Sequence, residues 1–291
     1  MYHSLAAAIK DAEAKGVSLS VVALETESRD QGRPVEEIRA VLGRALAIMR
    51  GAITRGAVGD LKSNSGLVGG DAGKLRESAA GPLGGPFRDV LMRALAVQEV
   101  NAAMGVIVAA PTAGGAGVLP AVLTGLADAR GISDDKLIDA LATAGLIGAV
   151  VAERASLSGA EGGCQAETGA AAGMAAGAAV EMLGGSPAQC GHAVALAQQG
   201  TLGLVCDPLG GLVELPCVFR NATGAAIALA AVEMALAGIE FAIPADEVID
   251  TMGQIGREMD VRYRETAGGG LAATPTGRRL AKERLYQLKK N

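Results

Sequence analysis

Apolar residues recur at helical spacing along most of this chain. The stretch PVEEIRAVLGRALAIMRGAI has its apolar residues three or four positions apart, at Val35, Ile38, Leu42, Ala45 and Met49. Pro34 leads the stretch, and Glu36 and Glu37 follow in the first turn, where carboxylates stabilise a helix N-terminus. The pattern therefore predicts an amphipathic helix.

The same pattern predicts helices in further stretches, two of which carry start signals. Ser133 precedes two aspartates, and Ser186 precedes a proline at the first helical position. Residues 18–26, SLSVVALET, fit a short strand or a helix, and no alternating run demands a sheet. We predict an all-α fold over residues 1–291: a single compact domain of buried Ala/Gly-rich helices with Gly-rich active-site loops. The further helical stretches are SDDKLIDALATAGLIGAVVAERA, SPAQCGHAVALAQQG, PFRDVLMRALAVQEVNAAMG, NATGAAIALAAVEMALAG and PADEVIDTMGQIGREMD.

One uncharged stretch raises the question of a membrane. Residues 101–127 exceed the roughly 20 residues that a membrane-spanning helix needs. Prolines and glycines interrupt the stretch, and the chain has no Trp and only three Tyr for interfacial belts. We favour a buried helix, a Gly-rich turn and a second buried helix, and expect no membrane contact.

Composition restricts the partners and the compartment. Half of the 291 residues are apolar but only 2% are aromatic, so small aliphatic side chains must build the core. The 42 glycines are about twice the usual share, which favours tight turns and close backbone contacts. A net charge of −5 without a basic run argues against nucleic acid. The N-terminal residues lack the long apolar region of a signal peptide, so we expect a cytoplasmic protein.

Two Gly-rich turns are candidate binding loops. They are DLKSNSGLVGGDAGKL, residues 60–75, and APTAGGAGVLPAVL, residues 110–123, and each precedes an apolar helix. Backbone N–H groups at such a helix start can bind a carboxylate or a phosphate. Neither turn ends in the Gly-Lys-Ser/Thr of a P-loop, and turns that only let helices pack closely have the same composition.

The four cysteines are widely and unequally spaced, which fits free thiols or metal ligands better than a disulfide framework. Cys190 lies on an apolar helical stripe, as a structural thiol does. Cys164, Cys206 and Cys217 lie among Gly and Pro at loop or helix-edge positions, where they can converge. Converging thiolates suit zinc or an iron–sulfur cluster. Spacing alone leaves both open, together with three unrelated buried thiols.

Five stretches resemble the alpha subunit of the bacterial iron–sulfur-dependent L-serine dehydratases, which are L-serine ammonia-lyases. The resemblance runs from about residue 55 to about residue 281 and keeps the family's order of motifs. That family carries a 4Fe-4S cluster on three cysteines, and Cys164, Cys206 and Cys217 reproduce their spacing, whereas Cys190 lies outside the pattern. The resemblance implies that these three are the cluster ligands and that no pyridoxal phosphate is required. The stretches are LKSNSGLVGGDAGKL, APTAGGAGVLPAVL, SGAEGGCQAETGAAAGMAAGAAVEMLGG, LVCDPLGGLVELPCVFRNATGAAIALAA and YRETAGGGLAATPTGRRL.

The implied reaction is the dehydration of L-serine to pyruvate and ammonia. A cluster held by three thiolates leaves one iron open as a Lewis acid for the serine hydroxyl. Ser63 and Ser65 are the candidate catalytic bases, although their hydroxyls can instead cap the following helix. Glu167 flanks Cys164 and can orient ligands, and Asn221 can instead be a helix N-cap. The candidate substrate-binding residues are Lys62, Gly66, Thr112, Gly114, Gly115, Glu161, Arg220 and Asn221.

The resemblance also implies a second subunit. Single-chain relatives begin with a domain whose Ser-rich, His-bearing loop closes over the cluster, and nothing similar lies between Met1 and Asp60. Two-subunit members place this part on a separate beta chain, so we expect a hetero-oligomer. Two alternatives remain: a related lyase acting on L-cysteine or another β-substituted amino acid, and an iron–sulfur redox sensor or electron carrier.

Overall fold

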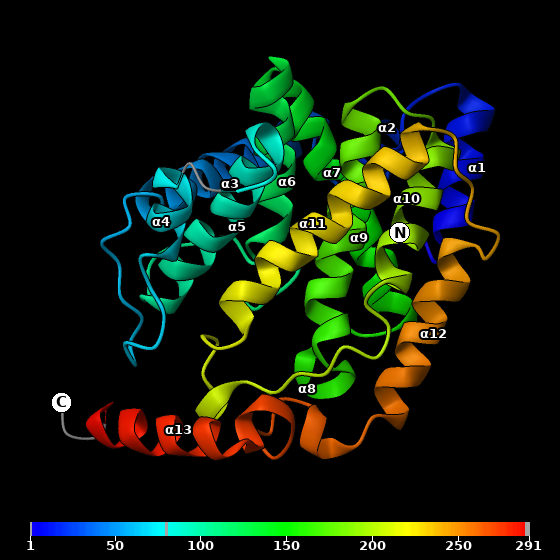
Figure 1. Cartoon of the computed structure of the whole chain (residues 1–291). Helices are drawn as coiled ribbons and strands as arrows, with labels where there is room; N and C mark the ends of the chain where they lie inside the picture. The colour runs from blue at the N-terminus through cyan, green and yellow to red at the C-terminus, as the bar shows by residue number, and fades with distance from the viewer. Residues whose placement is uncertain (1, 79–80, 289–291) are drawn as a thin grey trace.

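The computed structural model describes residues 2–78 and 81–288, and its regular structure is helical (Figure 1). This part of the chain contains no β-strand, only an isolated bridge between Cys206 and Arg264. The all-α prediction is confirmed. The α-helices are α1 (Leu5–Lys15), α2 (Leu19–Gln31), α3 (Val35–Gly56), α4 (Asp71–Glu77), α5 (Gly85–Ala102), α6 (Val118–Arg130), α7 (Asp134–Arg154), α8 (Gly159–Gly162), α9 (Ala170–Met182), α10 (Pro187–Gln199), α11 (Cys217–Leu236), α12 (Ala245–Glu258) and α13 (Pro275–Leu288). The short turns of other helix types are η1 (Gln165–Gly169), η2 (Leu209–Gly211), η3 (Val261–Tyr263) and η4 (Gly270–Ala273).

Helix α9 forms the centre of the packing and contacts α6, α7, α10 and α11 (Figure 1). All its residues are buried except Glu181, which is partly exposed. A Cβ at Gly177 would lie 2.6 Å from the side chain of Ile147 on α7 and 2.9 Å from that of Val194 on α10. Small residues thus let the neighbouring helices approach α9 closely, as the Ala/Gly-rich composition predicts.

One main hydrophobic core joins α1–α3, α5–α7 and α9–α12. The N-terminal helix is fixed to this core by Asp246 of α12. The Asp246 carboxylate accepts the N–H groups of Leu5 at 2.8 Å and Ala6 at 3.0 Å, at the start of α1. The chain is therefore a single compact unit, as predicted.

Helix boundaries follow several of the predicted signals. Ser186 and Gln189 form a capping box at the start of α10, because each side chain accepts the other residue's backbone N–H. Residues 18–26 belong to α2 and its N-cap rather than to a strand. Helix α11 begins at Cys217, a full turn before Asn221. The interpretation of Asn221 as a helix N-cap is therefore wrong.

The uncharged stretch 101–127 forms one buried helix rather than two. Helix α5 ends at Ala102, residues 103–117 are irregular, and only α6 follows. At the break, Met104 has a left-handed φ of 61° and Val106 is 75% exposed. The glycines and Pro111 prevent the helix from continuing.

Within the described residues, α11 is the one helix with the length and composition to cross a membrane, and 44% of its most apolar window is buried. The same helix packs against α5, α6, α9 and α10. A core helix of this kind passes the same test, so the membrane evidence is weak. The absence of membrane contact stays a prediction.

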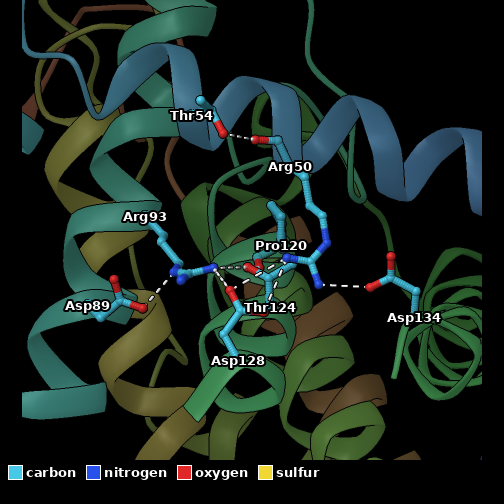
Figure 2. Close-up of polar contacts among 8 residues, drawn as sticks. All are labelled: Arg50, Thr54, Asp89, Arg93, Pro120, Thr124, Asp128 and Asp134. Carbon is cyan, nitrogen blue, oxygen red and sulfur yellow. Dashed lines mark hydrogen bonds and ion pairs between the residues drawn. The ribbon is translucent and has the colours of Figure 1, made fainter. Parts of the chain in front are cut away.

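A network of ion pairs links α3, α5, α6 and α7 (Figure 2). Asp128 of α6 pairs with Arg50 of α3 at 3.2 Å and with Arg93 of α5 at 2.8 Å. Arg50 also pairs with Asp134 at the start of α7, at 2.8 Å. Partial burial acts to raise the pKa of Asp128, but the hydrogen bonds and charges of the two arginines outweigh it and lower the pKa.

Asp128→Asn is expected to lower the free energy of unfolding by about 1 kcal/mol at neutral pH, because both guanidinium groups lose a charged acceptor at a half-exposed site. Folding lowers the pKa of Asp128 below its ordinary value of 3.8. The contribution of Asp128 to the free energy of unfolding is therefore fully present above pH 3.8 and is lost as the pH falls through the lower pKa of the folded state. Urea unfolding across this pH range measures the difference, with Glu283→Gln as a surface control. Equal stability of Asp128→Asn and the wild type at neutral pH would contradict the role of the network.

Candidate functional site

Cys164 and Cys217 lie at the starts of helical segments, and Cys206 lies outside any helix. Cys164 directly precedes the π-helical turn η1, Cys206 lies in an irregular segment, and Cys217 begins α11. All three are free thiols and only 2–7% exposed. Burial, and then charge on Cys164 and Cys217, raise the pKa of Cys206, so the thiols lie within electrostatic range of one another. Cys190 lies apart, in the main hydrophobic core, as predicted for a structural thiol.

The chemistry of these thiols fits an iron–sulfur cluster. Burial raises the pKa of Cys164 and raises that of Cys217 to about 12, while the Arg220 charge acts in the opposite direction on both. A bound metal must therefore displace their protons. Within residues 2–78 and 81–288, no three His, Cys, Asp or Glu side chains gather tightly enough to hold a single metal ion. The charges of the three thiols act on one another, and three cysteine thiolates are a ligand set that an iron–sulfur cluster can use.

The first turn of α11 fixes the segment that carries Cys206. Arg220 donates to the carbonyl of Val205 at 2.8 Å and pairs with Asp207 at 2.8 Å, so it holds the residues on both sides of Cys206. Asp207 is 2% exposed and also accepts the N–H of Leu271 at 2.6 Å. Arg220 is thus committed to positioning this segment.

The C-terminal Gly-rich segment pairs with the same cysteine. The N–H of Cys206 donates to the carbonyl of Tyr263 at 2.8 Å, and the carbonyl of Cys206 accepts the N–H of Glu265 at 2.8 Å. Glu265 has a left-handed φ of 63°, and its charge raises the pKa of Cys206 after the larger effects of burial and nearer groups. The sequence pattern gave no indication of a role for Glu265.

Asn221 connects α11 to the second Gly-rich loop. Its side chain is fully buried, and its amide donates to the carbonyls of Gly114 at 2.7 Å and Cys217 at 2.9 Å. Its side-chain oxygen accepts the N–H of Gly117 at 2.9 Å. Asn221 therefore fixes this loop against the backbone of Cys217.

Glu214 connects the first Gly-rich loop to the residues just before Cys217. Its carboxylate is 3% exposed. One oxygen, Oε2, accepts the hydroxyl of Ser63 at 2.7 Å and that of Ser65 in a shorter contact, and Oε1 accepts the N–H of Ser65 at 3.1 Å. Sequence reasoning missed Glu214. The available signal was a single acidic residue within an apolar segment, because carboxylates are almost never fully buried without partners.

The N-terminus of α4 is occupied by a carboxylate of the protein itself. Glu99 of α5 is 1% exposed and accepts the N–H groups of Gly70 at 3.1 Å, Asp71 at 2.6 Å and Ala72 at 3.2 Å. Burial raises the pKa of Glu99, against the smaller opposing effect of these donors. The expectation that this helix start offers free N–H groups to a ligand is wrong, and the serine hydroxyls do not cap α4.

Glu167, on η1, faces the second Gly-rich loop and Cys206. It accepts the hydroxyl of Thr112 at 2.6 Å, and its carboxylate lies 3.9 Å from the sulfur of Cys206. A Cβ at Gly114 would lie 2.8 Å from either carboxylate oxygen, so this close approach requires glycine. Burial raises the pKa of Glu167, and the Thr112 hydroxyl lowers it by less.

The remaining predicted residues lie at the edge of this group or outside it. Lys62 and Gly66 are exposed on the first loop, and Gly115 packs against the backbone of Glu167. Glu161 lies away from the group: it is exposed, accepts the hydroxyl of Ser156 at 2.6 Å and lines a separate pocket.

Asn221→Leu is expected to lower the free energy of unfolding by about 2 to 3 kcal/mol, because buried backbone groups of Gly114 and Gly117 lose their partner. Thr223→Val, at an exposed position on the same helix, is the control and should change stability by less than about 0.5 kcal/mol. Urea unfolding measures both. A result in which Asn221→Leu matches Thr223→Val would remove Asn221 from its connecting role.

Comparison with known proteins extends the resemblance across almost the whole chain. Residues 5–272 match the family described as serine dehydratase alpha chain, so the match also covers α1–α3, which precede the sequence motifs. The chain is 47% identical over 289 residues to a Bacillus subtilis (strain 168) protein named "Probable L-serine dehydratase, alpha chain", covering 97% of this chain and 95% of the relative. It is 38% identical over 276 residues to the "L-serine dehydratase, alpha chain" of Peptoniphilus asaccharolyticus, covering 94% of each.

A longer relative shows the same similarity over part of its length. The Streptomyces coelicolor (strain ATCC BAA-471 / A3(2) / M145) protein named "L-serine dehydratase" is 42% identical over 266 residues, which are 89% of this chain and 58% of that protein. Residues 5–272, which match the family, include the three cysteine segments and both Gly-rich loops. The chain belongs to the serine dehydratase alpha chain family.

Proposed function

We propose that the chain is the alpha subunit of an L-serine dehydratase, which converts L-serine to pyruvate and ammonia. The observation that carries the proposal is the attachment of both polar Gly-rich loops and the Cys206 segment to residues within or just before the first turn of α11, beside Cys217. A redox sensor or electron carrier would need the cysteines but not the loops. The names of the relatives support serine as the substrate.

Cys164, Cys206 and Cys217 would hold a 4Fe-4S cluster. Burial acts to lower the pKa of Arg220, but the charges of Cys164, Asp207 and Cys217 raise it. The Arg220 guanidinium would therefore offset part of the negative charge of the thiolates. When bound, the cluster supplies a Lewis-acidic iron that makes the serine hydroxyl a better leaving group. The proposal needs no pyridoxal phosphate.

The two loops bind the charged groups of serine in this proposal. Lys62 and N–H groups of the second loop take the carboxylate, and the partly buried carboxylate of Glu167 accepts the ammonium group beside Thr112. A partly buried carboxylate has already lost part of its hydration. It therefore gains more binding free energy from a cationic ligand than a fully hydrated carboxylate does. Glu161 has no part in this contact, since it lies in another pocket.

Ser63 and Ser65 are the proposed proton-transfer residues. One serine oxygen removes the Cα proton while its own proton passes to Oε2 of Glu214, which accepts both hydroxyls in the resting chain. The β-hydroxyl then takes up the proton held by Glu214 and leaves as water, while the electron pair of the broken Cα–H bond forms the double bond of aminoacrylate. Glu214 and the serine are thereby returned to their resting protonation states. Hydrolysis of its imine tautomer consumes one water and releases ammonia and pyruvate.

A second, beta chain completes the enzyme in this proposal. The two histidines of the chain do not face the cysteine loops: His3 pairs with Glu153 near the N-terminus, and His192 accepts the N–H of Phe241 at 3.3 Å. The names of the relatives as alpha chains support a partner subunit. We also propose a cytoplasmic location, with which four free thiols agree.

Replacing Cys164, Cys206 or Cys217 by Ala is expected to abolish cluster assembly, because each removes one of three thiolate ligands. Cys190→Ala is the matched control, since it removes an equally buried thiol from the hydrophobic core. Iron content and visible absorbance after anaerobic reconstitution measure cluster loading. A cluster that survives in one of the first three variants, or is lost in Cys190→Ala alone, overturns the ligand assignment.

The proposed activity is tested by pyruvate release from L-serine, L-threonine and L-cysteine after reconstitution without oxygen. We expect pyruvate from L-serine when the beta chain is added, and little turnover by this chain alone. Absence of pyruvate from the loaded two-chain complex would refute the dehydratase assignment. Preference for L-cysteine would favour the related lyase, and full turnover without the beta chain would refute the requirement for a partner.

A further inference from the structure

A separate pocket of about 340 Å³ lies behind the segment that carries Cys164. Its walls come from the end of α7, from α8 and from the second half of α12, together with Arg264 from the segment that pairs with Cys206. Gly162 and Ala166 line it, whereas none of the three cysteines does. Glu167, on the same turn as Ala166, faces Cys206 instead. The pocket is therefore distinct from the cysteine site.

Buried hydrogen bonds fix the walls of this pocket. Gln165 is fully buried and donates to the carbonyls of Gly162 at 2.9 Å and Met252 at 3.1 Å, which join α8 to α12. A Cβ at Gly256 would lie 2.7 Å from the Cα of Gly162, so the two backbones are in close contact. The cavity is a formed feature of the packing, not a gap between loose segments.

The pocket carries charged groups of both signs. Arg257 and Arg264 line it, and within the part of the chain that the structure describes neither forms an ion pair. The Nε of Arg264 is buried without a hydrogen-bond partner there. Glu161 also lines the pocket, with Oε2 bound by the hydroxyl of Ser156 at 2.6 Å. A ligand with a single negative charge would meet Glu161 unfavourably, and a simple cation would meet two guanidinium groups.

We infer that this pocket binds a small α-amino acid in its zwitterionic form, as a second amino acid site. The carboxylate pairs with the guanidinium groups of Arg257 and Arg264, whose fork of donors matches carboxylate geometry. The ammonium group pairs with Glu161. Only a ligand with both charges satisfies all three side chains. The inference shares its class of ligand with the proposed function but uses none of the residues that the function assigns to catalysis.

The position of this site connects it to the cysteines. A bound amino acid would contact Gly162 and Ala166, on the two sides of Cys164, and Arg264, whose backbone lies beside that of Cys206. Ligand binding would therefore stabilise two of the three cysteine segments. Because Arg257 and Glu161 are exposed, the affinity should be modest and should fall at high salt.

L-Alanine is the probe of choice, because it has both charged groups but no β leaving group. Isothermal titration calorimetry with the full chain should show binding that is at least tenfold weaker for Arg257→Ala and Glu161→Gln. Arg278→Ala, which removes an exposed arginine from α13, should leave it unchanged. Pyruvate, without the ammonium group, and ethylamine, without the carboxylate, should each bind at least tenfold more weakly than L-alanine.

Cys217→Ala separates this site from the cysteine site, because Cys217 does not line the pocket. L-Alanine binding that persists in this variant, and is lost on adding Arg257→Ala, supports the inference. Wild-type affinity in both Arg257→Ala and Glu161→Gln would overturn it, and so would pyruvate binding as tightly as L-alanine. These results are independent of pyruvate release, so the dehydratase assignment can stand or fall separately.

Discussion

The candidate site depends on polar side chains buried around the first turn of α11. Glu214, Arg220 and Asn221 lie within or just before this turn and hold three separate segments: the first Gly-rich loop, the Cys206 segment and the second Gly-rich loop. An unpartnered buried polar group costs about 1–3 kcal/mol, whereas a whole domain is stable by only about 5–15 kcal/mol. Release of any one segment would leave such groups without partners and would lower the free energy of unfolding by a substantial fraction. The loops are therefore held in one arrangement, which fixed substrate contacts require.

Small residues make this arrangement possible. The Ala- and Gly-rich surface of α9 lets helices pack closely on several sides, and Gly114 lets the second loop reach the carboxylate of Glu167. Glu99 and Glu214 are buried in this region and Glu167 is partly buried. Within the described residues, hydroxyl, thiol and backbone groups serve as their partners instead of Lys or Arg. Such neutral donors satisfy a carboxylate without adding a second charge that must also be desolvated. Glu99 uses them to close the start of α4, while Glu214 uses them to hold the two serines.

The electrostatics of the thiol group agree with the proposed chemistry. Burial raises the pKa of Cys164 and Cys217, and the charge of Arg220 acts in the opposite direction on both. The loading of metal must supply the free energy that deprotonates them. The second pocket differs in character, because its arginines and Glu161 are more exposed and its proposed ligand exchanges with solvent.

The sequence by itself determined the helical fold, the small-residue core, the family and the separation of Cys190 from the other three cysteines. These features depend on periodicity, composition and motif order, which are local properties of the chain. The start of α11 at Cys217, the closure of α4 by Glu99 and the contact of Glu214 with Ser63 and Ser65 came only from the tertiary structure. The two glutamate contacts join residues far apart in the chain, and a carboxylate in a sequence looks the same whether water or a distant loop is its partner. Glu161 and Glu167 make the point most directly: both flank Cys164, but the turn between them directs Glu167 toward Cys206 and Glu161 into another pocket, because helical geometry sets the direction of each side chain.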